Sequence, residues 1–229
     1  MEGPRIDFKA ARERMVASLR RHVKDQRVLD AFASVPRERF VPADLQQHAY
    51  DDRALPIGAE QTISQPLIVA LMLEALSLRA EDKALEVGTG SGYQAALMSL
   101  LVREVITVER IPRLADTAAA RLRELGYANV RVYLAGEALG WPEEAPYDAI
   151  VVAAGAPEPP LSLVDQLAMN GRMIVPAGSR DLQQLVRVIK SERGVSLERL
   201  GECRFVPLIA RREGWSDRQA SHNGAKASF

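Results

Sequence analysis

The chain has 229 residues, of which 47% are hydrophobic and 26% are charged, and its formal net charge is zero. This length supports one large core, or one core with a small addition, and the neutral balance argues against a protein that binds nucleic acid through a basic face. The single cysteine, Cys203, excludes an internal disulfide, and the three histidines (His22, His48 and His222) lack metal-ligand spacing, so we expect no metal site.

Residues 1–80 predict helices and turns rather than alternating strands and helices. Apolar residues recur every three or four positions over 7–23, which predicts a helix with Asp7 as its N-cap. A second, short helix is predicted over 26–33. Three prolines then indicate a stretch of turns: Pro36, Pro42 and Pro56.

From residue 83 the pattern alternates between apolar strands and helices. It predicts strands over 83–87, 104–108, 130–134, 148–154 and 171–175, and helices over 93–102, 112–125 and 161–168. Strands that alternate with helices imply a doubly wound, mostly parallel α/β sheet with helices on both faces. Two further predicted strands, 182–190 and 203–209, have no helix between them, so we expect an antiparallel hairpin at one edge. The polar residues 213–229 are expected to form a frayed tail.

The strongest local signal is the run Glu86-Val87-Gly88-Thr89-Gly90-Ser91-Gly92, which follows the first predicted strand and precedes a helix. Glycines at this point let the backbone pass close to a nucleotide-type ligand, and Glu109, which closes the second strand, can accept hydrogen bonds from ribose hydroxyls. A tight strand-to-helix connection would also explain the glycines alone. Glu86 favours a positively charged ligand over a pyrophosphate, and therefore S-adenosylmethionine over NAD.

Further motifs give this chain a clear resemblance to the protein-L-isoaspartate O-methyltransferases. Matching segments run in the family order from about residue 26 to 210: Ala49-Tyr50, Leu55-Pro56-Ile57-Gly58, Gln61-Thr62-Ile63-Ser64-Gln65-Pro66, the glycine motif 86–92, Val108-Glu109-Arg110, Gly140-Trp141-Pro142, the segment 145–150, Gly171-Arg172 and the segment 204–208. The resemblance implies a seven-stranded Rossmann-like methyltransferase sheet with an N-terminal helical extension. It divides the chain into a helical and substrate-loop region (1–80), a cofactor-binding core (81–212) and the tail (213–229).

The resemblance also implies an activity and a site. The enzyme would transfer a methyl group from S-adenosylmethionine to the free α-carboxylate of L-isoaspartyl residues in damaged proteins and peptides, and so initiate their repair through a succinimide. Ser64 would be the catalytic residue. Substrate would be bound by Thr62, Ile63, Pro56, Val206 and Leu208. Cofactor would be bound by Glu86, Gly88, Thr89, Gly90, Gly92, Glu109, Arg110, Gly136 and Glu137.

The sequence departs from the family pattern at three places. The third strand is usually followed by Gly-Asp-Gly, whose aspartate approaches the adenine amino group, whereas this chain has Ala135-Gly136-Glu137. Ala153 replaces a threonine that is common after the fourth strand, and Glu60 stands where glycine is frequent. These departures keep open a family member that methylates a different peptide carboxylate, or one that only binds. An NAD oxidoreductase is disfavoured by Glu86.

The remaining expectations concern where and with what the chain works. The N-terminal segment has no apolar core of the kind a secretory signal needs, and no apolar run approaches the ~20 residues that span a bilayer. We therefore expect a cytoplasmic protein without membrane or nucleic-acid partners. Nothing in the sequence demands an oligomer, so a monomer is expected.

Overall fold

The computed structural model describes residues 6–210 and 213–215. The N-terminal region contains α1 (Phe8–Leu19) and α2 (Gln26–Ser34), the 3₁₀ helices η1 (Arg37–Phe40) and η2 (Ala43–His48), a short hairpin of β1 (Leu55–Gly58) and β2 (Gln61–Ile63), and α3 (Pro66–Leu76). The N-caps of the first two helices are Asp7 and Asp25, whose carboxylates accept main-chain hydrogen bonds from Ala10 and Arg27. The expected helices 7–23 and 26–33 are therefore present, the first ending earlier than predicted.

The core alternates strands with helices, as the sequence predicts. In chain order the elements are β3 (Lys83–Val87), α4 (Tyr93–Ser99), β4 (Glu104–Glu109), α5 (Pro112–Glu124), β5 (Val130–Leu134), η3 (Pro142–Glu144), β6 (Tyr147–Val152), α6 (Leu161–Asp165), β7 (Leu167–Gly178), β8 (Gln183–Ser191) and β9 (Gly194–Cys203). They form one seven-stranded sheet in the order β5-β4-β3-β6-β7-β8-β9. Strands β3 to β7 are parallel, and β8 and β9 are antiparallel to their neighbours.

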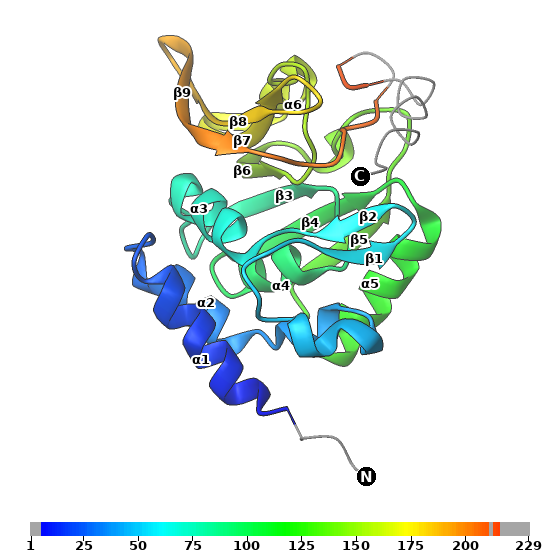
Figure 1. Ribbon diagram of the computed structural model, residues 1–229. Helices are drawn as coiled ribbons and strands as arrows, with labels where there is room; N and C mark the ends of the chain where they lie inside the picture. The colour runs from blue at the N-terminus through cyan, green and yellow to red at the C-terminus, as the bar shows by residue number, and fades with distance from the viewer. Residues whose placement is uncertain (1–5, 211–212, 216–229) are drawn as a thin grey trace.

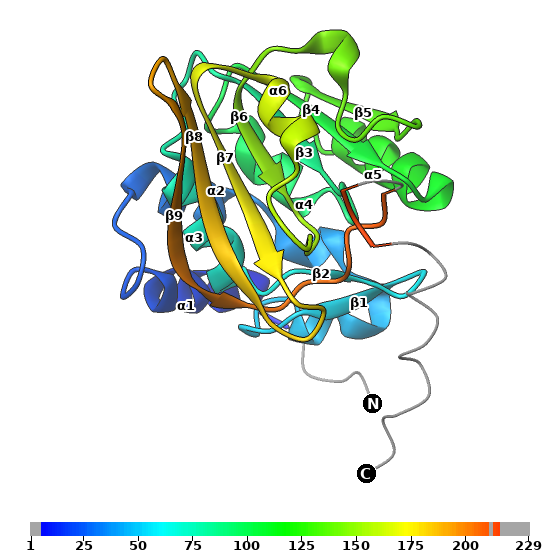
Figure 2. The same ribbon diagram turned by 90° about the horizontal axis from the view of Figure 1, so that it is seen from above.

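Helices cover the two faces of the sheet unequally (Figures 1 and 2). Helices α1 to α4 pack on one face around a core that contains Phe32, Leu73 and Leu97. The short helix α6 lies on the other face, over Ile150, Met173 and Val188. None of the described helices is both long and apolar enough to cross a membrane.

The chain leaves β3 toward β4 and β5 on one side and later returns to β6 and β7 on the other side. This reversal makes the carboxyl ends of β3 and β6 a topological switch point, where open α/β sheets bind ligands. The β1–β2 hairpin and the segment that follows β9 both pass this edge of the sheet (Figure 2). The fold therefore brings two segments that lie far apart in the sequence, 61–64 and 206–210, to one site.

One expectation about the C-terminal part was wrong in detail. The edge hairpin exists, but its second strand is β9 (Gly194–Cys203), not 203–209. Residues 205–209 instead run beside the loop after β6, where Gly155 donates to the Val206 carbonyl (2.8 Å) and accepts from the Leu208 amide (2.7 Å). The expected tail 213–229 lies outside the described residues except for 213–215, which pack against α6 and the segment after β9: Glu213 accepts from the Ser162 amide, and the Trp215 amide donates to the Leu208 carbonyl.

Candidate active site

The glycine-rich turn brings main chain, rather than side chains, to the carboxyl end of β3. Gly88 has a φ of +101°, which favours glycine, and a Cβ there would lie 3.4 Å from the Cβ of Ala153. The Val108 carbonyl fixes the turn by accepting from the amides of Gly88 (2.9 Å) and Thr89 (3.2 Å). A ligand can therefore approach the backbone directly.

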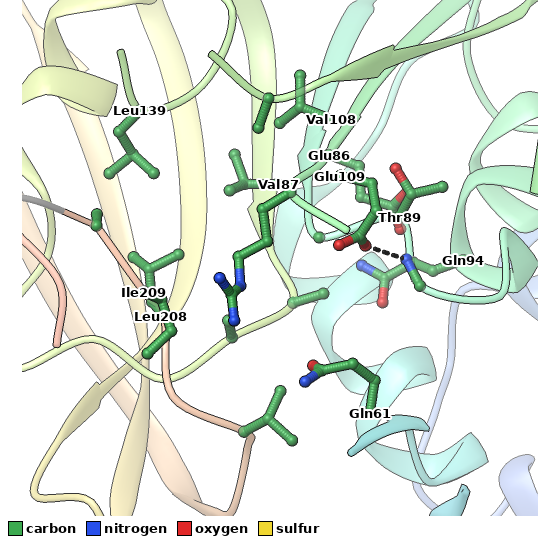
Figure 3. Close-up of a pocket in the computed structure, with 18 of the residues that line it drawn as sticks. Gln61, Glu86, Val87, Thr89, Gln94, Val108, Glu109, Leu139, Leu208 and Ile209 are labelled. Atoms are coloured by element: carbon green, nitrogen blue, oxygen red, sulfur yellow. Dashed lines mark hydrogen bonds between the residues drawn. The ribbon is translucent and has the colours of Figure 1, made fainter. Parts of the chain in front are cut away.

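A cavity of about 550 Å³ opens above this turn. Figure 3 shows Glu86, Thr89, Gln94 and Glu109 on one side of the cavity, and Leu139, Leu208 and Ile209 on the other. Its size falls in the range of cavities that bury a cofactor-sized molecule. One side is polar and acidic, whereas the other is apolar.

Glu109 ends β4 and lies at the cavity with its carboxylate already oriented. One carboxylate oxygen accepts from the Gly90 amide (2.8 Å), and the other accepts from the Ile111 amide (3.0 Å). Each oxygen keeps a lone pair, so the carboxylate can still accept hydrogen bonds from a ligand's hydroxyl groups.

Glu86 is more deeply buried than Glu109 and accepts fewer hydrogen bonds. Its side chain is fully buried, Thr107 donates to one oxygen (2.6 Å), and the other oxygen has no hydrogen-bond partner. Burial raises the pKa of Glu86 to about 8; the Thr107 hydrogen bond opposes this and the nearby Glu109 adds to it. A buried carboxylate with an unpaired oxygen is costly, and a bound cation would remove that cost.

Most residues expected at the site line this cavity. They are Thr62, Ile63, Ser64, Glu86, Gly88, Thr89, Gly90, Glu109, Arg110, Gly136, Glu137, Val206 and Leu208. Pro56 does not line it: this residue is exposed and pairs with Thr62 across the β1–β2 hairpin. Gly92 also lies outside the lining, and a Cβ there would lie 3.3 Å from Leu122 of α5, so this glycine serves helix packing.

Several lining residues were not expected from the sequence. Tyr93 and Gln94, at the start of α4, both line the cavity, and the buried amide nitrogen of Gln94 has no partner. Trp215 also contributes, from the segment expected to be frayed. Trp141 stacks on Tyr133 at 4.4 Å between ring centroids and does not line the cavity.

Ser64 follows β2 and stands between two cavities. The hairpin tip carries two non-glycine residues with left-handed backbone, Ala59 (φ +51°) and Glu60 (φ +57°), and Glu60 lines neither cavity. A second cavity of about 430 Å³ is also lined by Thr62 and Ser64, together with Gln65, Ile68 and residues 202–206. The two cavities share four lining residues: Thr62, Ser64, Ala153 and Val206.

The described residues contain no cluster of three or more His, Cys, Asp or Glu side chains that could hold a metal ion. The acidic groups of the first cavity instead suit an organic cation with a ribose. Glu86 fits a positively charged amino group, and Glu109 fits the ribose hydroxyls. Together with the sheet topology, these features define the class as the Rossmann-like methyltransferases that use S-adenosylmethionine.

Comparisons with known proteins identify the family. The family model for protein-L-isoaspartate(D-aspartate) O-methyltransferase matches residues 10–213. A protein-L-isoaspartate O-methyltransferase from Syntrophobacter fumaroxidans is 49% identical over 92% of this chain and 99% of its own length, and one from Rhodopseudomonas palustris is 50% identical over 93% and 98%. A Plasmodium falciparum structure assigned to the same enzyme class, in complex with S-adenosyl-L-homocysteine, superposes with a TM-score of 0.75 at 27% identity and covers 88% of this chain and 98% of that one.

The chain belongs to the protein-L-isoaspartate O-methyltransferase family. It is a carboxyl methyltransferase that takes its methyl group from S-adenosylmethionine and initiates the repair of L-isoaspartyl residues. The resemblance seen in the sequence and the expected fold class are thereby confirmed.

Proposed function

We propose that the first cavity binds the cofactor, the second cavity binds the isoaspartyl peptide, and methyl transfer takes place between them beside Ser64. The observation that supports this division is the wall formed by Thr62, Ser64, Ala153 and Val206, which both cavities share. A peptide carboxylate reaching past Ser64 from the second cavity would meet a methyl group presented from the first.

S-adenosylmethionine, when bound, supplies a methyl group on a positively charged sulfur, and Glu86 and Glu109 would hold its amino group and ribose. The Gln94 amide, buried and unpaired on the same side, would meet its carboxylate. Thr89, Arg110, Gly136 and Glu137 complete the proposed contacts at the turn and at the loop after β5. Main chain at Gly88 and Gly90 would approach the ligand closely.

The chain's own residues have little acid–base chemistry to perform. A peptide carboxylate is ionised near neutral pH, so its oxygen can attack without a general base. The new bond joins this oxygen to the methyl carbon as the sulfur–methyl bond breaks, and the products are a neutral methyl ester and a neutral thioether. Ser64 would donate a hydrogen bond that orients the carboxylate, and apolar neighbours such as Val206 and Leu208 would exclude water.

The test is methyl transfer from labelled S-adenosylmethionine to one peptide prepared in matched isoaspartyl and aspartyl forms. We expect base-labile label on the isoaspartyl form alone. Ser64→Ala should bind S-adenosylhomocysteine normally and lose at least about tenfold in rate, the value of one charge-assisted hydrogen bond. Equal rates for Ser64→Ala and the unmodified protein would remove Ser64 from the mechanism.

We also propose that residues 81–212 act as the cofactor unit, that residues 1–80 supply the substrate loop, and that the protein works as a cytoplasmic monomer on isoaspartyl proteins. The free, buried thiol of Cys203, whose pKa burial raises to about 11, suits a reducing compartment. Size-exclusion chromatography with light scattering tests whether the protein is a monomer, and fractionation of cells tests whether it is cytoplasmic.

A further inference from the structure

Arg37 is a buried cation next to the Ser64 loop, and none of the roles described above uses it. It opens η1 and is completely shielded from solvent. Its Nε donates to the Ala49 carbonyl (2.7 Å), and one terminal nitrogen donates to the Ser64 carbonyl (2.8 Å). The other terminal nitrogen is buried without a hydrogen-bond partner.

Arg37 has no direct counter-ion among the described residues, and the charge of Asp52 offsets only part of the effect of burial, which lowers the pKa of Arg37. The ion pairs found among residues 6–210 and 213–215 do not include Arg37, whose guanidinium carbon instead lies 4.7 Å from the ring centroid of Tyr93. Burying a charged group without a counter-ion costs free energy, so a role in stability alone explains it poorly. Attraction between this charge and the carboxylate of a bound substrate would offset the cost.

The Ser64 loop is also fixed from its other side. Asp52 accepts from the Leu67 amide (3.0 Å) at the start of α3 and from the Gln65 side chain (3.0 Å). Asp52 is exposed, whereas Arg37 is buried. The segment 64–67 is therefore held by a buried guanidinium at Ser64 and by an exposed carboxylate at Gln65 and Leu67, and both groups come from the N-terminal region.

We propose that Arg37, assisted by Asp52, is a positioning residue for methyl transfer: it fixes Ser64 through its main-chain carbonyl and places a buried positive charge behind the Ser64 loop, outside both cavity linings but near enough to favour a carboxylate held at Ser64. The proposal rests on the role of Ser64 proposed above. Arginine suits the task because its planar fork reaches two carbonyls at once while its face stacks on Tyr93. Lysine would keep the charge but lose one of these contacts.

Steady-state kinetics can distinguish the two roles of Arg37, which are to fix the Ser64 loop and to supply a positive charge. Arg37→Lys keeps the charge and loosens the loop, so kcat should fall at least about tenfold while the peptide KM changes less than about threefold. Arg37→Gln also removes the charge and should in addition raise the peptide KM about tenfold. Affinity for S-adenosylhomocysteine, measured by calorimetry, should stay within about threefold in both variants.

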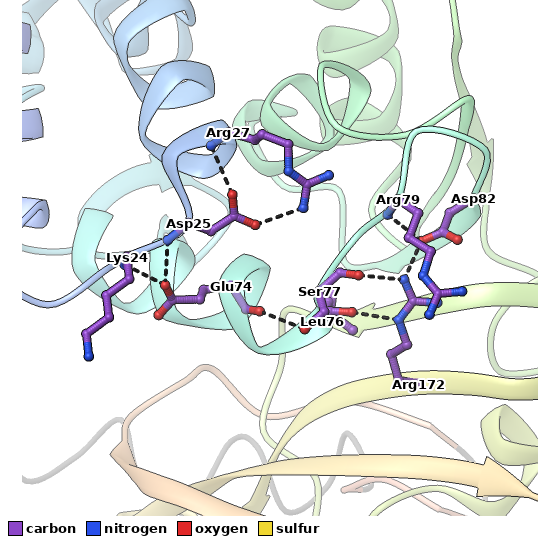
Figure 4. A network of polar contacts seen from close by, with 9 residues as sticks. All are labelled: Lys24, Asp25, Arg27, Glu74, Leu76, Ser77, Arg79, Asp82 and Arg172. Atoms are coloured by element: carbon purple, nitrogen blue, oxygen red, sulfur yellow. Dashed lines mark hydrogen bonds and ion pairs between the residues drawn. The ribbon is translucent and has the colours of Figure 1, made fainter.

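Arg172 offers a matched control, because it is also a buried arginine bound to main-chain carbonyls. It donates to the carbonyls of Leu76 (2.6 Å) and Ser77 (2.9 Å) and pairs with Asp82, and it lies away from both cavities (Figure 4). Arg172→Lys should lower the unfolding temperature and leave kcat and KM of the folded fraction unchanged.

The proposal is overturned if both Arg37 variants have a lower unfolding temperature but unchanged kcat and KM, as is expected of Arg172→Lys. Equal peptide KM values for Arg37→Lys and Arg37→Gln would overturn the electrostatic part. If the Arg37 variants do not fold, Asp52→Asn is the deciding variant: kcat reduced at least about fivefold supports the clamp, and an unchanged kcat overturns it. An unmodified protein that does not label the isoaspartyl peptide contradicts the proposed function instead.

Discussion

Replacing Glu86 by glutamine should make the protein more stable and less able to bind its cofactor. The carboxyl is completely buried with one oxygen unpaired, and its pKa rises from 4.5 to about 8 mainly because of burial. A folded-state pKa above the unfolded value contributes stability below pH 4.5, and this contribution is lost as the pH rises toward 8. At pH 7 the loss relative to an unperturbed carboxyl is at most about 3 kcal/mol.

Glutamine keeps the shape of Glu86 and an oxygen that can accept from Thr107, but it is neutral at every pH and so needs no proton uptake on folding. We therefore expect Glu86→Gln to raise the unfolding temperature at pH 7 by up to roughly 6–10 °C for a chain of this length, with the gain vanishing near pH 4. Affinity for S-adenosylhomocysteine should fall about 100-fold or more, because an amide would face the ligand's ammonium group without a counter-charge.

The assays are thermal unfolding between pH 4 and 8 and calorimetric titration with S-adenosylhomocysteine. Glu109→Gln is the matched control: its carboxylate is satisfied by the Gly90 and Ile111 amides, so this variant should lose about 1–2 kcal/mol of stability instead. A Glu86→Gln variant with a lower unfolding temperature at pH 7 would refute the view that the buried carboxyl destabilises the protein. A variant that keeps its affinity for S-adenosylhomocysteine would refute a role of Glu86 in cofactor binding.

Three other changes test individual positions. Glu60→Gly should stabilise the protein by about 0.5–1 kcal/mol in chemical denaturation, because it relieves a left-handed backbone, whereas Glu60→Ala should give no gain. Gln94→Met should weaken S-adenosylhomocysteine binding about tenfold in calorimetry while leaving the peptide KM unchanged, since the amide lines only the first cavity. Arg204→Glu, at the second cavity, should raise KM for peptides with acidic flanking residues and lower it for basic ones; equal shifts for both peptides would argue against a peptide in that cavity.

The parallel core could be predicted because its strands and helices differ clearly in apolar pattern. Each of β3, β4 and β6 is almost entirely buried, as strands covered on both faces are, and each is a short, mostly apolar run. The prolines and glycines at the helix ends set the boundaries.

Helix α3 (Pro66–Leu76) was missed because it has no clear amphipathic stripe. It packs between the N-terminal helices and the sheet, so apolar residues occur nearly all around it. The second strand of the C-terminal hairpin was placed at 203–209 for a different reason. Strand β9 is exposed along most of its length and reads as polar, whereas 205–209 is apolar because it lines the site.

The sequence also indicated only part of the site. Glu86 and Glu109, which both line the first cavity, could be predicted as cofactor ligands because their positions relative to the glycines have chemical meaning in any sheet of this kind. Arg37 and Trp215 could not, because no local pattern distinguishes a core arginine or a C-terminal tryptophan from one that approaches a cavity. Gly92 was assigned to the cofactor because a motif does not show which of its glycines faces the ligand and which faces a helix.

Because burial raises the pKa of Glu86, cofactor binding should be linked to the release of a proton. With a pKa of about 8, the carboxyl is about 90% protonated at pH 7 in the free protein. An ammonium group against its unpaired oxygen stabilises the ionised form, so binding should release close to one proton, and affinity should rise about tenfold per pH unit until pH 8. Calorimetry in two buffers of different ionisation enthalpy measures this release directly. A binding heat that is independent of the buffer would mean that Glu86 keeps the same protonation state on binding, and this outcome would refute proton-linked binding.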